Sequence, residues 1–324
     1  MKAVVYERYG PPEVLELRDL PEPTPGDGEV VVRVRAAGTN AGDWHLMRGD
    51  PFLVRLVVGG ITRPKHPVLG GNVAGTVEAV GPGVTDLAPG DDVVGELSEY
   101  GYGGFAEQVR GPATAFVRKP EAVSFVEGAA LPTAGITALQ ALRDGGGLKT
   151  GERVLVNGAS GGVGTFAVQI AKVMGAHVTG VCSTRNLELV GSIGADEVVD
   201  YTRTDITEGG ARFDLVIDVA AFRSFMDYRG ILTPGGRYVL VGGAPARTYQ
   251  IMLLGPLVSM VGDRTMKFFI TQPTSDDLKT LLDWMADGRI RTVLDRTYPL
   301  AEVPEAIRYL ETGRARGKVV IGVP

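Results

Sequence analysis

The chain has 324 residues, 44% of them hydrophobic and 22% charged, with a formal net charge of -5. A chain of this length holds about two domains and can bury a large core without disulfide bonds or metal ions. The negative charge argues against a nucleic-acid-binding surface, and the single cysteine, Cys182, excludes an internal disulfide and a cysteine-rich zinc site.

The first third of the chain is expected to consist of short strands. Apolar and β-branched residues predict strands at 2–6, 14–17, 30–37, 75–80 and 93–95, with turns rich in Gly and Pro between them. The expected arrangement is a folded-over β-barrel. The chain enters its first strand without the features of a signal peptide, and no apolar stretch is long enough to span a membrane. A cytoplasmic location without membrane contact is therefore expected.

After residue 121 the pattern changes to alternating helices and strands. Helical spacing predicts a helix at 125–142, followed by strands at 153–156, 177–182, 197–199, 215–219 and 238–241, with helices at 162–174 and 186–193. Apolar runs such as Val154-Leu155-Val156 are typical of strands buried on both faces. This order predicts a doubly wound parallel sheet with helices on both sides, an α/β fold. An apolar stretch at 252–260 is either a core helix or a dimer surface.

The C-terminal segment predicts a return to the first domain. A helix at 275–286, with Ser275 as its N-cap, is followed by a helix at 303–312 and a strand at 318–322. This last part is more similar in pattern to the N-terminal domain than to the second one. The predicted domains are therefore 1–122 together with 288–324, and 123–287.

A glycine-rich turn between a predicted strand and a predicted helix is the strongest local motif. Its glycines are spaced Gly158-x-x-Gly161-x-x-Gly164, one residue longer than the common dinucleotide fingerprint. Glycines permit the tight turn and the close approach of a diphosphate to backbone amides at the N-terminus of a helix. An ordinary strand-to-helix turn is the alternative. The predicted cofactor-binding residues here are Gly158, Ala159, Ser160, Gly161, Gly162, Val163 and Gly164.

The end of the next strand bears on the choice between NAD and NADP. Enzymes that use NAD usually carry Asp or Glu at this place, whereas residues 182–186 read Cys-Ser-Thr-Arg-Asn. Arg185 either pairs with the 2′-phosphate of NADPH, with Ser183 as a further donor, or is a solvated residue at a helix start. Cys182 is expected to pack in the core.

Together with these motifs, five segments resemble the medium-chain dehydrogenase/reductase superfamily. They are AGTNAGD at 37–43, PVLGGNVAGTV at 67–77, the turns VGPG at 80–83 and GDDV at 90–93, GGFAE at 103–107, and AALPTAGITAL at 129–139. The ending GKVVI at 317–321 is also similar. The resemblance covers the whole chain and implies a GroES-like β-barrel catalytic domain and a Rossmann domain that binds NADPH.

The resemblance is to the zinc-free quinone oxidoreductases within that superfamily. Zinc-type alcohol dehydrogenases carry Cys where this chain has Asn40, and His-Glu where it has Gly71-Asn72. With one cysteine and three dispersed histidines, no set of three zinc ligands is expected. Asn40 matches an Asn that faces the cleft near the nicotinamide or the substrate in the zinc-free enzymes. Asp43 is expected to cap the following helix. His45 stands where a Tyr is common, and is either a proton donor or a surface histidine.

Other residues are assigned to the site by the same resemblance. Thr137 is expected near the nicotinamide and Tyr201 near the adenosine phosphate, and Lys318 is counted among the cofactor-binding residues. Gly242 and Gly243 are expected close to the nicotinamide ring. The alternatives are that Thr137 only caps or packs and that the two glycines only turn the chain. The apolar insertion at 51–64 is a substrate lid, a core element or a dimer contact, and a homodimer is expected.

These expectations predict an oxidoreductase that transfers a hydride from NADPH to a quinone or an α,β-unsaturated carbonyl compound without zinc. Asn40 would polarise the carbonyl group, and water or His45 would supply the proton. A zinc-independent enoyl reductase or alcohol/aldehyde reductase is a second possibility. A non-catalytic NADPH-binding protein with a structural or sensing role is a third.

Overall fold

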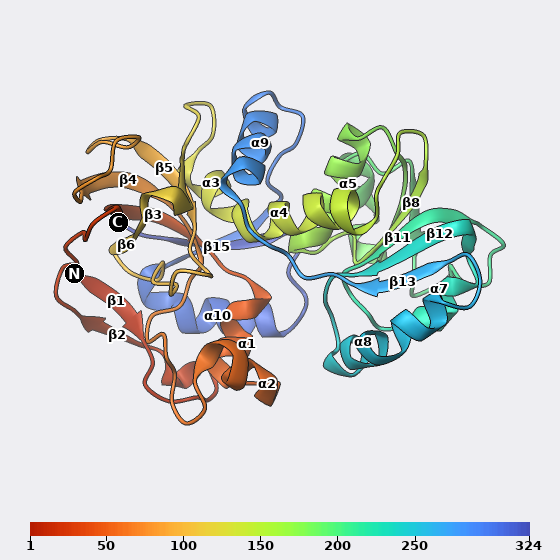
Figure 1. Ribbon diagram of the computed structural model, residues 1–324, viewed down its shortest axis with the longest axis horizontal. Helices are drawn as coiled ribbons and strands as arrows, with labels where there is room; N and C mark the ends of the chain where they lie inside the picture. Colours follow the sequence, from red (N-terminus) through yellow and green to blue (C-terminus); the bar gives the residue numbers. More distant parts are fainter. The chain divides into compact units, whose positions relative to one another are not determined.

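The computed structural model describes residues 1–324, which divide into two compact units. Unit 1 contains Met1–Ala134 and Pro273–Pro324, and unit 2 contains Gly135–Gln272. Both ends of the chain therefore belong to unit 1 (Figure 1). None of the helices has the length and apolarity that a membrane crossing requires.

Unit 1 is built on a seven-stranded sheet in the order β14-β15-β3-β4-β5-β7, with β6 paired to β3. A separate antiparallel pair is formed by β1 (Lys2–Val5) and β2 (Glu16–Asp19). In the large sheet β15 runs antiparallel to β3, with Val320 opposite Gly38, so the end of the chain adds a strand beside an early one. The bounds are β3 (Glu29–Gly38), β4 (Asn72–Val80), β5 (Asp92–Glu96), β6 (Gln108–Pro112), β7 (Phe116–Arg118), β14 (Leu294–Pro299) and β15 (Lys318–Gly322).

The division between the units differs from the predicted boundaries at 122 and 288, because two more helices belong to unit 1. Helix α3 (Phe125–Ala130) packs against β3 and β4, and α9 (Ser275–Ala286) packs against β7. Both helices therefore belong to unit 1. Helix α9 begins after Thr274, whose hydroxyl accepts from the amide of Asp277, so the predicted N-cap at Ser275 is wrong by one residue. The remaining helices are α1 (Ala41–Arg48), α2 (Phe52–Val54) and α10 (Val303–Glu311).

The helix predicted at 125–142 is broken in two. It continues after α3 as α4 (Pro132–Gln140) and ends in a π-helical turn at Ala141–Gly145. Pro132 has no backbone N–H and cannot continue the hydrogen-bond pattern of a preceding helix, so a new helix starts at this proline. Helical periodicity carries across the break, which is why the sequence pattern indicates one helix.

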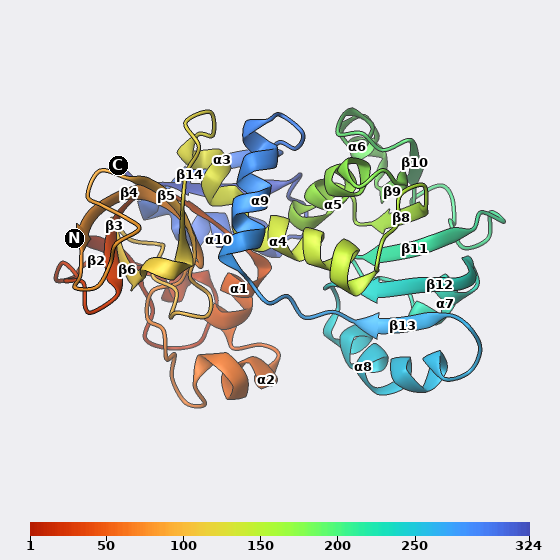
Figure 2. The same cartoon turned by 45° about the horizontal axis from the view of Figure 1, so that its top comes forward.

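Unit 2 is a six-stranded parallel sheet in the order β10-β9-β8-β11-β12-β13. Helix α5 (Gly162–Val173) lies on one side of the sheet, and α7 (Phe225–Arg229) and α8 (Pro245–Ser259) lie on the other (Figures 1 and 2). The predicted doubly wound sheet is thus confirmed. The strands are β8 (Arg153–Asn157), β9 (His177–Cys182), β10 (Glu197–Asp200), β11 (Phe213–Asp218), β12 (Leu232–Leu240) and β13 (Thr265–Phe268), and α6 (Leu187–Ser192) joins β9 to β10.

The strand order of unit 2 marks one edge of its sheet as the place for a ligand, because the order reverses direction between β8 and β11. Sheets of this kind bind ligands at the carboxyl ends of the strands beside such a reversal. The glycine turn follows β8 and therefore lies at this edge.

The apolar stretch at 252–260 forms the second half of helix α8 and its C-cap, Met260, and most of it is not in the core. Leu253 is 74% exposed and Met260 is 81% exposed, whereas Ile251 and Gly255 face inward. The core-helix alternative is therefore wrong for most of this segment. Strand β13, which α8 packs on, forms one edge of the sheet.

Candidate active site

The glycine turn has the backbone geometry that a diphosphate site requires. Gly158 adopts φ +83°, a left-handed conformation that favours glycine, and its amide and that of Ala159 both donate to the carbonyl of Val181 on β9. Gly164 lies so close to the turn that a Cβ there would be 2.1 Å from the carbonyl oxygen of Gly158. The first turn of α5 is thereby packed directly on the end of β8.

Gly161 caps helix α5 and leaves open space over the turn. Its backbone is extended, with φ -84° and ψ 178°, and a Cβ there would meet nothing closer than the Gly158 carbonyl oxygen at 3.5 Å. The amides of the first helical turn have no preceding carbonyl within the helix to bond, and they carry the positive end of the helix dipole. The Gly161 amide donates to the Gly158 carbonyl at 3.1 Å and closes the turn. The amides of Ser160, Gly162 and Val163 then surround a cradle that fits a dinucleotide diphosphate.

Asn186 joins this turn to the end of β9. Its side-chain amide donates to the hydroxyl of Ser160 at 2.8 Å and to that of Ser183 at 3.3 Å, and only 4% of the residue is exposed. Asn186 thus holds two predicted cofactor residues, Ser160 and Ser183, in place, although the sequence pattern did not indicate a role for Asn186. No motif marks Asn186, because its role depends on two loops that meet only in the folded chain.

Beyond β9, a short 3₁₀ helix (Thr184–Asn186) carries Arg185 on the surface. Strand β10 ends beside it with Asp200, whose carboxylate accepts from the hydroxyls of Thr184 and Thr202 at 2.5 and 2.7 Å. The Thr184 hydroxyl is the main cause that lowers the pKa of Asp200. A carboxylate therefore stands near the end of β9 after all, supplied by the neighbouring strand. Tyr201 follows it and is half exposed.

A buried carboxylate lies at the end of β11, the neighbour of β8 at the point where the strand order reverses. Asp218, at the end of β11, accepts from Asn157 at 2.7 Å, from the Tyr238 hydroxyl at 2.7 Å, and from the amides of Ala220 and Ala221. Burial raises the pKa of this carboxyl group, and the four hydrogen bonds oppose that effect. The network ties the end of β8 to the loop after β11.

The glycines after β12 lie against that loop. Gly243 has φ +119°, and a Cβ there would be 2.5 Å from the Ala220 carbonyl oxygen and from the Ala221 side chain. Gly243 therefore needs glycine for close packing and for its backbone conformation, whereas Gly242 has open space around it. Thr137, on α4, is almost fully buried, and its hydroxyl accepts from Thr271 at 2.9 Å. This buried hydrogen bond is consistent with the alternative that Thr137 has a packing role.

In unit 1 the predicted Asn40 begins helix α1 directly after strand β3. The carboxylate of Asp43 accepts from the backbone amide of Asn40 at 2.7 Å, which confirms that Asp43 caps this helix. Its other oxygen accepts from the amide of Gly70 at 3.1 Å. Burial raises the pKa of Asp43 to about 6, and these two hydrogen bonds and the charge of Lys318 reduce the rise.

Lys318 lies beside Asn40 in unit 1. Its ammonium group donates to the side-chain oxygen of Asn40 at 2.6 Å and to the carbonyl of Thr39 at 2.7 Å, and the residue is 3% exposed. Burial lowers the pKa of Lys318 to about 8, against the opposing charge of Asp43. The partners of this ammonium group all belong to unit 1, and the cofactor-binding role predicted for Lys318 stays a prediction.

A second polar cluster lies one strand away. The Thr133 hydroxyl contacts the side-chain oxygen of Asn72 at 2.6 Å and Glu96 at 3.2 Å, and Ser98 donates to Glu96 at 2.9 Å. Burial raises the pKa of Glu96. Asn72 is fully buried and pairs with Gly38 across β3 and β4, at the position where zinc-type enzymes carry Glu. Its side-chain nitrogen has no protein partner.

His45 lies on α1, half buried. Its Nδ1 atom is 2.7 Å from the carbonyl oxygen of Asp50, and its ring stacks on that of Trp44 with centroids 3.6 Å apart. Both the proton-donor role and the surface role predicted for His45 stay predictions. Cys182, the single cysteine, is buried on β9, and its pKa is raised to about 11 by burial and by Asp200.

The apolar insertion at 51–64 is turned outward. Leu56 is 54% exposed and Val57 is 73% exposed, so the core-element alternative is wrong for these side chains. Arg55 instead points inward: it donates to the carbonyl of Gly49 at 2.8 Å and lies over the ring of Tyr9 at 4.4 Å. The segment is thus anchored by its charged residue while its apolar residues face solvent.

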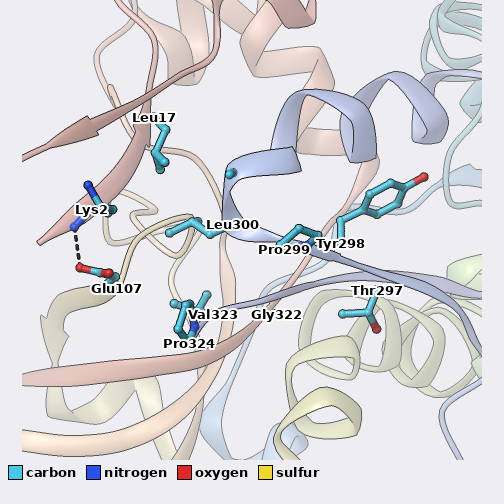
Figure 3. A pocket seen from close by; sticks show the side chains of 11 residues that line it. Lys2, Leu17, Glu107, Thr297, Tyr298, Pro299, Leu300, Gly322, Val323 and Pro324 are labelled. Carbon is cyan, nitrogen blue, oxygen red and sulfur yellow. Dashed lines mark hydrogen bonds between the residues drawn. The ribbon is translucent and has the colours of Figure 1, made fainter.

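A pocket of roughly 580 Å³ in unit 1 contains none of the predicted site residues (Figure 3). Its apolar wall includes Leu17, Leu300 and Val323, and it opens beside the contact between the Lys2 amide and the Glu107 carboxylate at 2.6 Å. Nothing in it bears on hydride transfer.

Comparisons with known proteins agree on both units. Residues 26–121 match the family model of the alcohol dehydrogenase GroES-like domain, and residues 193–321 match that of the zinc-binding dehydrogenases. The chain is 35% identical to a chloroplast envelope quinone oxidoreductase homolog of Arabidopsis thaliana, over 99% of this chain and 98% of the relative. It is also 35% identical to the trans-enoyl reductase pgmF of Aspergillus terreus, over 92% and 87%.

The crystal structure of an NAD-dependent alcohol dehydrogenase is similar over the full length of both chains, with 32% identity and a TM-score of 0.85. These likenesses cover the GroES-like and Rossmann folds together, and they identify an oxidoreductase that uses a nicotinamide cofactor. The chain belongs to the medium-chain dehydrogenase/reductase superfamily.

Proposed function

We propose that this protein uses NADPH to reduce a quinone or another α,β-unsaturated carbonyl compound, and that it does so without a metal ion. The observation that carries the proposal is Asn40. It stands where zinc-type relatives carry a cysteine ligand, and its side-chain nitrogen has no acceptor within the protein. A donor of this kind suits a carbonyl oxygen that gains negative charge during reduction.

NADPH, when bound, supplies a hydride with its two electrons and leaves as NADP⁺. The glycine turn of unit 2 would hold the diphosphate through the amides of Ser160, Gly162 and Val163, and the side chain of Asn186 would keep Ser160 and Ser183 in place. Asn40 would donate a hydrogen bond to the carbonyl oxygen of the acceptor. One proton from water balances the reaction, and His45 is the candidate side chain for its delivery.

The preference for NADPH over NADH is part of this proposal and rests on Arg185. A guanidinium group at the end of β9 suits a 2′-phosphate. Asp200 lies near the same strand end and would repel a phosphate, but its carboxylate is bonded by Thr184 and Thr202 and lies 3.6 Å from Arg203. These contacts offset its charge and keep it from serving as a ribose acceptor.

The absence of a metal is supported by the kinds of residue present. Catalytic zinc needs three protein ligands, and the positions that supply them in zinc-type relatives hold Asn40, Gly71 and Asn72 here. Without a metal to stabilise an alkoxide, reduction of a conjugated carbonyl is chemically easier than oxidation of an alcohol. We also propose a homodimer formed through the edge strand β13 and the exposed apolar residues of α8.

The test is stopped-flow oxidation of NADPH with a panel of quinones, enones and saturated aldehydes, with and without a chelator. We expect turnover of quinones or enones that the chelator leaves unchanged. Loss of activity in the chelator would refute the metal-free mechanism, and turnover of saturated aldehydes alone would favour the carbonyl-reductase alternative. Tight NADPH binding without turnover of any acceptor would indicate the non-catalytic alternative.

A further inference from the structure

Lys318 begins strand β15 and lies beside Asn40, the N-cap of α1. The register of β15 against β3 pairs Val320 with Gly38, the last residue of β3. Just beyond this pair, the amide of Thr39 donates to the carbonyl of Val319 at 3.0 Å, so β15 continues along the segment that leads into α1. This arrangement brings the start of β15 next to the N-terminus of α1, where the Lys318 ammonium contacts the Asn40 side-chain oxygen at 2.6 Å.

This contact determines how the Asn40 amide is turned. An ammonium group can only donate hydrogen bonds, so the atom of Asn40 that faces it must be the oxygen. The NH₂ group must then point away from Lys318. Because the same ammonium also binds the carbonyl of Thr39 at 2.7 Å, its own position is fixed by the backbone next to Asn40.

We propose that Lys318 is a positioning residue for the reduction, which holds the Asn40 amide so that its NH₂ group is presented to the carbonyl oxygen of the substrate. This inference rests on the proposed function. It adds a residue of the last strand to the reaction, and the role differs from the cofactor contact expected from the sequence. Lys318 acts through Asn40 and does not itself touch the substrate.

The surroundings of Lys318 show that packing alone does not require a lysine here. The following residues of β15, Val319, Val320 and Ile321, are apolar and fully buried or nearly so. An apolar residue of similar volume would fit such a strand without the desolvation cost of a buried charge. The charge of Asp43 opposes the burial cost of the Lys318 ammonium, while the oxygens of Asp43 are bonded to the amides of Asn40 and Gly70. The hydrogen bonds of the ammonium group itself go to Thr39 and Asn40.

A double-mutant cycle separates positioning from a structural role. We expect Asn40→Ala to lower kcat/KM for a quinone or enone by about 10²-fold, as for loss of one oxyanion donor. Lys318→Met should lower it by about 10-fold, since the amide then samples both orientations, and the dissociation constant of NADPH should stay within about two-fold. In the Asn40→Ala background, Lys318→Met should cost no more than about two-fold. If the double variant lost the product of the two single-variant losses in kcat/KM, the two residues would act independently and the proposal would be overturned.

Lys119→Met is the matched control. Lys119 is also a lysine of unit 1 with a largely buried side chain that donates to two backbone carbonyls, those of Pro120 and Val123, but it contacts no amide side chain. We expect kcat/KM of Lys119→Met to stay close to that of the wild type. A loss equal to that of Lys318→Met would show that removal of any buried lysine has this effect, and would overturn the proposal.

Asn40→Asp decides the matter if Lys318→Met does not fold. The carboxylate keeps the contact with Lys318 but has no N–H group to donate. We expect kcat/KM to fall at least as far as in Asn40→Ala, while the melting temperature is unchanged or higher. Activity retained in Asn40→Asp would overturn the proposal. The proposed function fails separately, if the wild type reduces no quinone or enone or if Asn40→Ala remains fully active.

Discussion

Alanine substitutions along the glycine turn separate its structural role from its role in binding. At Gly164 a Cβ would lie 2.1 Å from the Gly158 carbonyl oxygen and 2.9 Å from the Ala159 Cα, so the backbone itself must move. We expect Gly164→Ala to lower the free energy of unfolding by about 3 kcal/mol, the upper part of the range for overpacking. At Gly158, with φ +83°, alanine should cost roughly 1–2 kcal/mol in backbone strain.

Gly161→Ala is the informative variant, because this position tolerates a methyl group in the folded chain. Its φ of -84° suits any residue, and the nearest atom to the added Cβ is 3.5 Å away. The loss of a glycine N-cap and the lower entropy of the unfolded chain nearly cancel, so stability should change by less than about 1 kcal/mol. The methyl group would nevertheless project over the cradle, and we expect the dissociation constant of NADPH to rise at least about tenfold.

The assays are denaturant unfolding for stability and fluorescence titration with NADPH for binding. Gly209→Ala serves as the control, since a Cβ there meets nothing within 4 Å and the residue lies outside the turn. It should match the wild type in both assays. If Gly161→Ala bound NADPH as tightly as the wild type, the diphosphate would not lie over this turn and the assignment of the cofactor site would be refuted.

Three further predictions concern single features of the site. Arg185→Glu should raise the KM for NADPH far more than that for NADH in steady-state kinetics, and equal changes would contradict the 2′-phosphate assignment. Asp43 has a pKa of about 6 when folded against 3.8 when unfolded, so the folded state binds the extra proton and stability falls as pH rises from about 4 to 6. In Asp43→Asn the free energy of unfolding, measured with denaturant at several pH values, should lack this fall of roughly 3 kcal/mol. The same pH dependence in the variant and the wild type would contradict the prediction. Replacing the exposed Leu56 and Val57 with Ser should change stability by less than about 0.5 kcal/mol each and, if the segment is a substrate lid, lower kcat/KM selectively for enones with long apolar tails.

Local patterns in the chain predicted the elements of unit 2 well. Continuous apolar runs indicated strands buried on both faces, and the alternation with helices indicated the parallel sheet that the structure has. The glycine turn was also predictable, because positive φ at Gly158 and the close approach of Gly164 are requirements of a few neighbouring residues. The capping of α1 by Asp43 belongs to the same class, since the two bonded groups are three residues apart.

Contacts between distant residues were not predictable in this way. Asn186 joins Ser160 to Ser183 through the side chain of a residue 26 positions from Ser160, and Asp200 reaches the end of β9 only because β10 pairs with it in register. The short strand β13 carries too little apolar pattern to be recognised before α8 and β12 pack against it.

The amino-acid sequence by itself determined the order of the elements, the glycine turn and the kinds of side chain available to the reaction, because these depend on conformational preferences within a few residues. The tertiary structure alone decided that Lys318 faces Asn40 across 278 residues of chain. The physical reason is strand register: a shift of one residue between β15 and β3 would turn Lys318 to the other face of the sheet and leave the Asn40 amide without its partner.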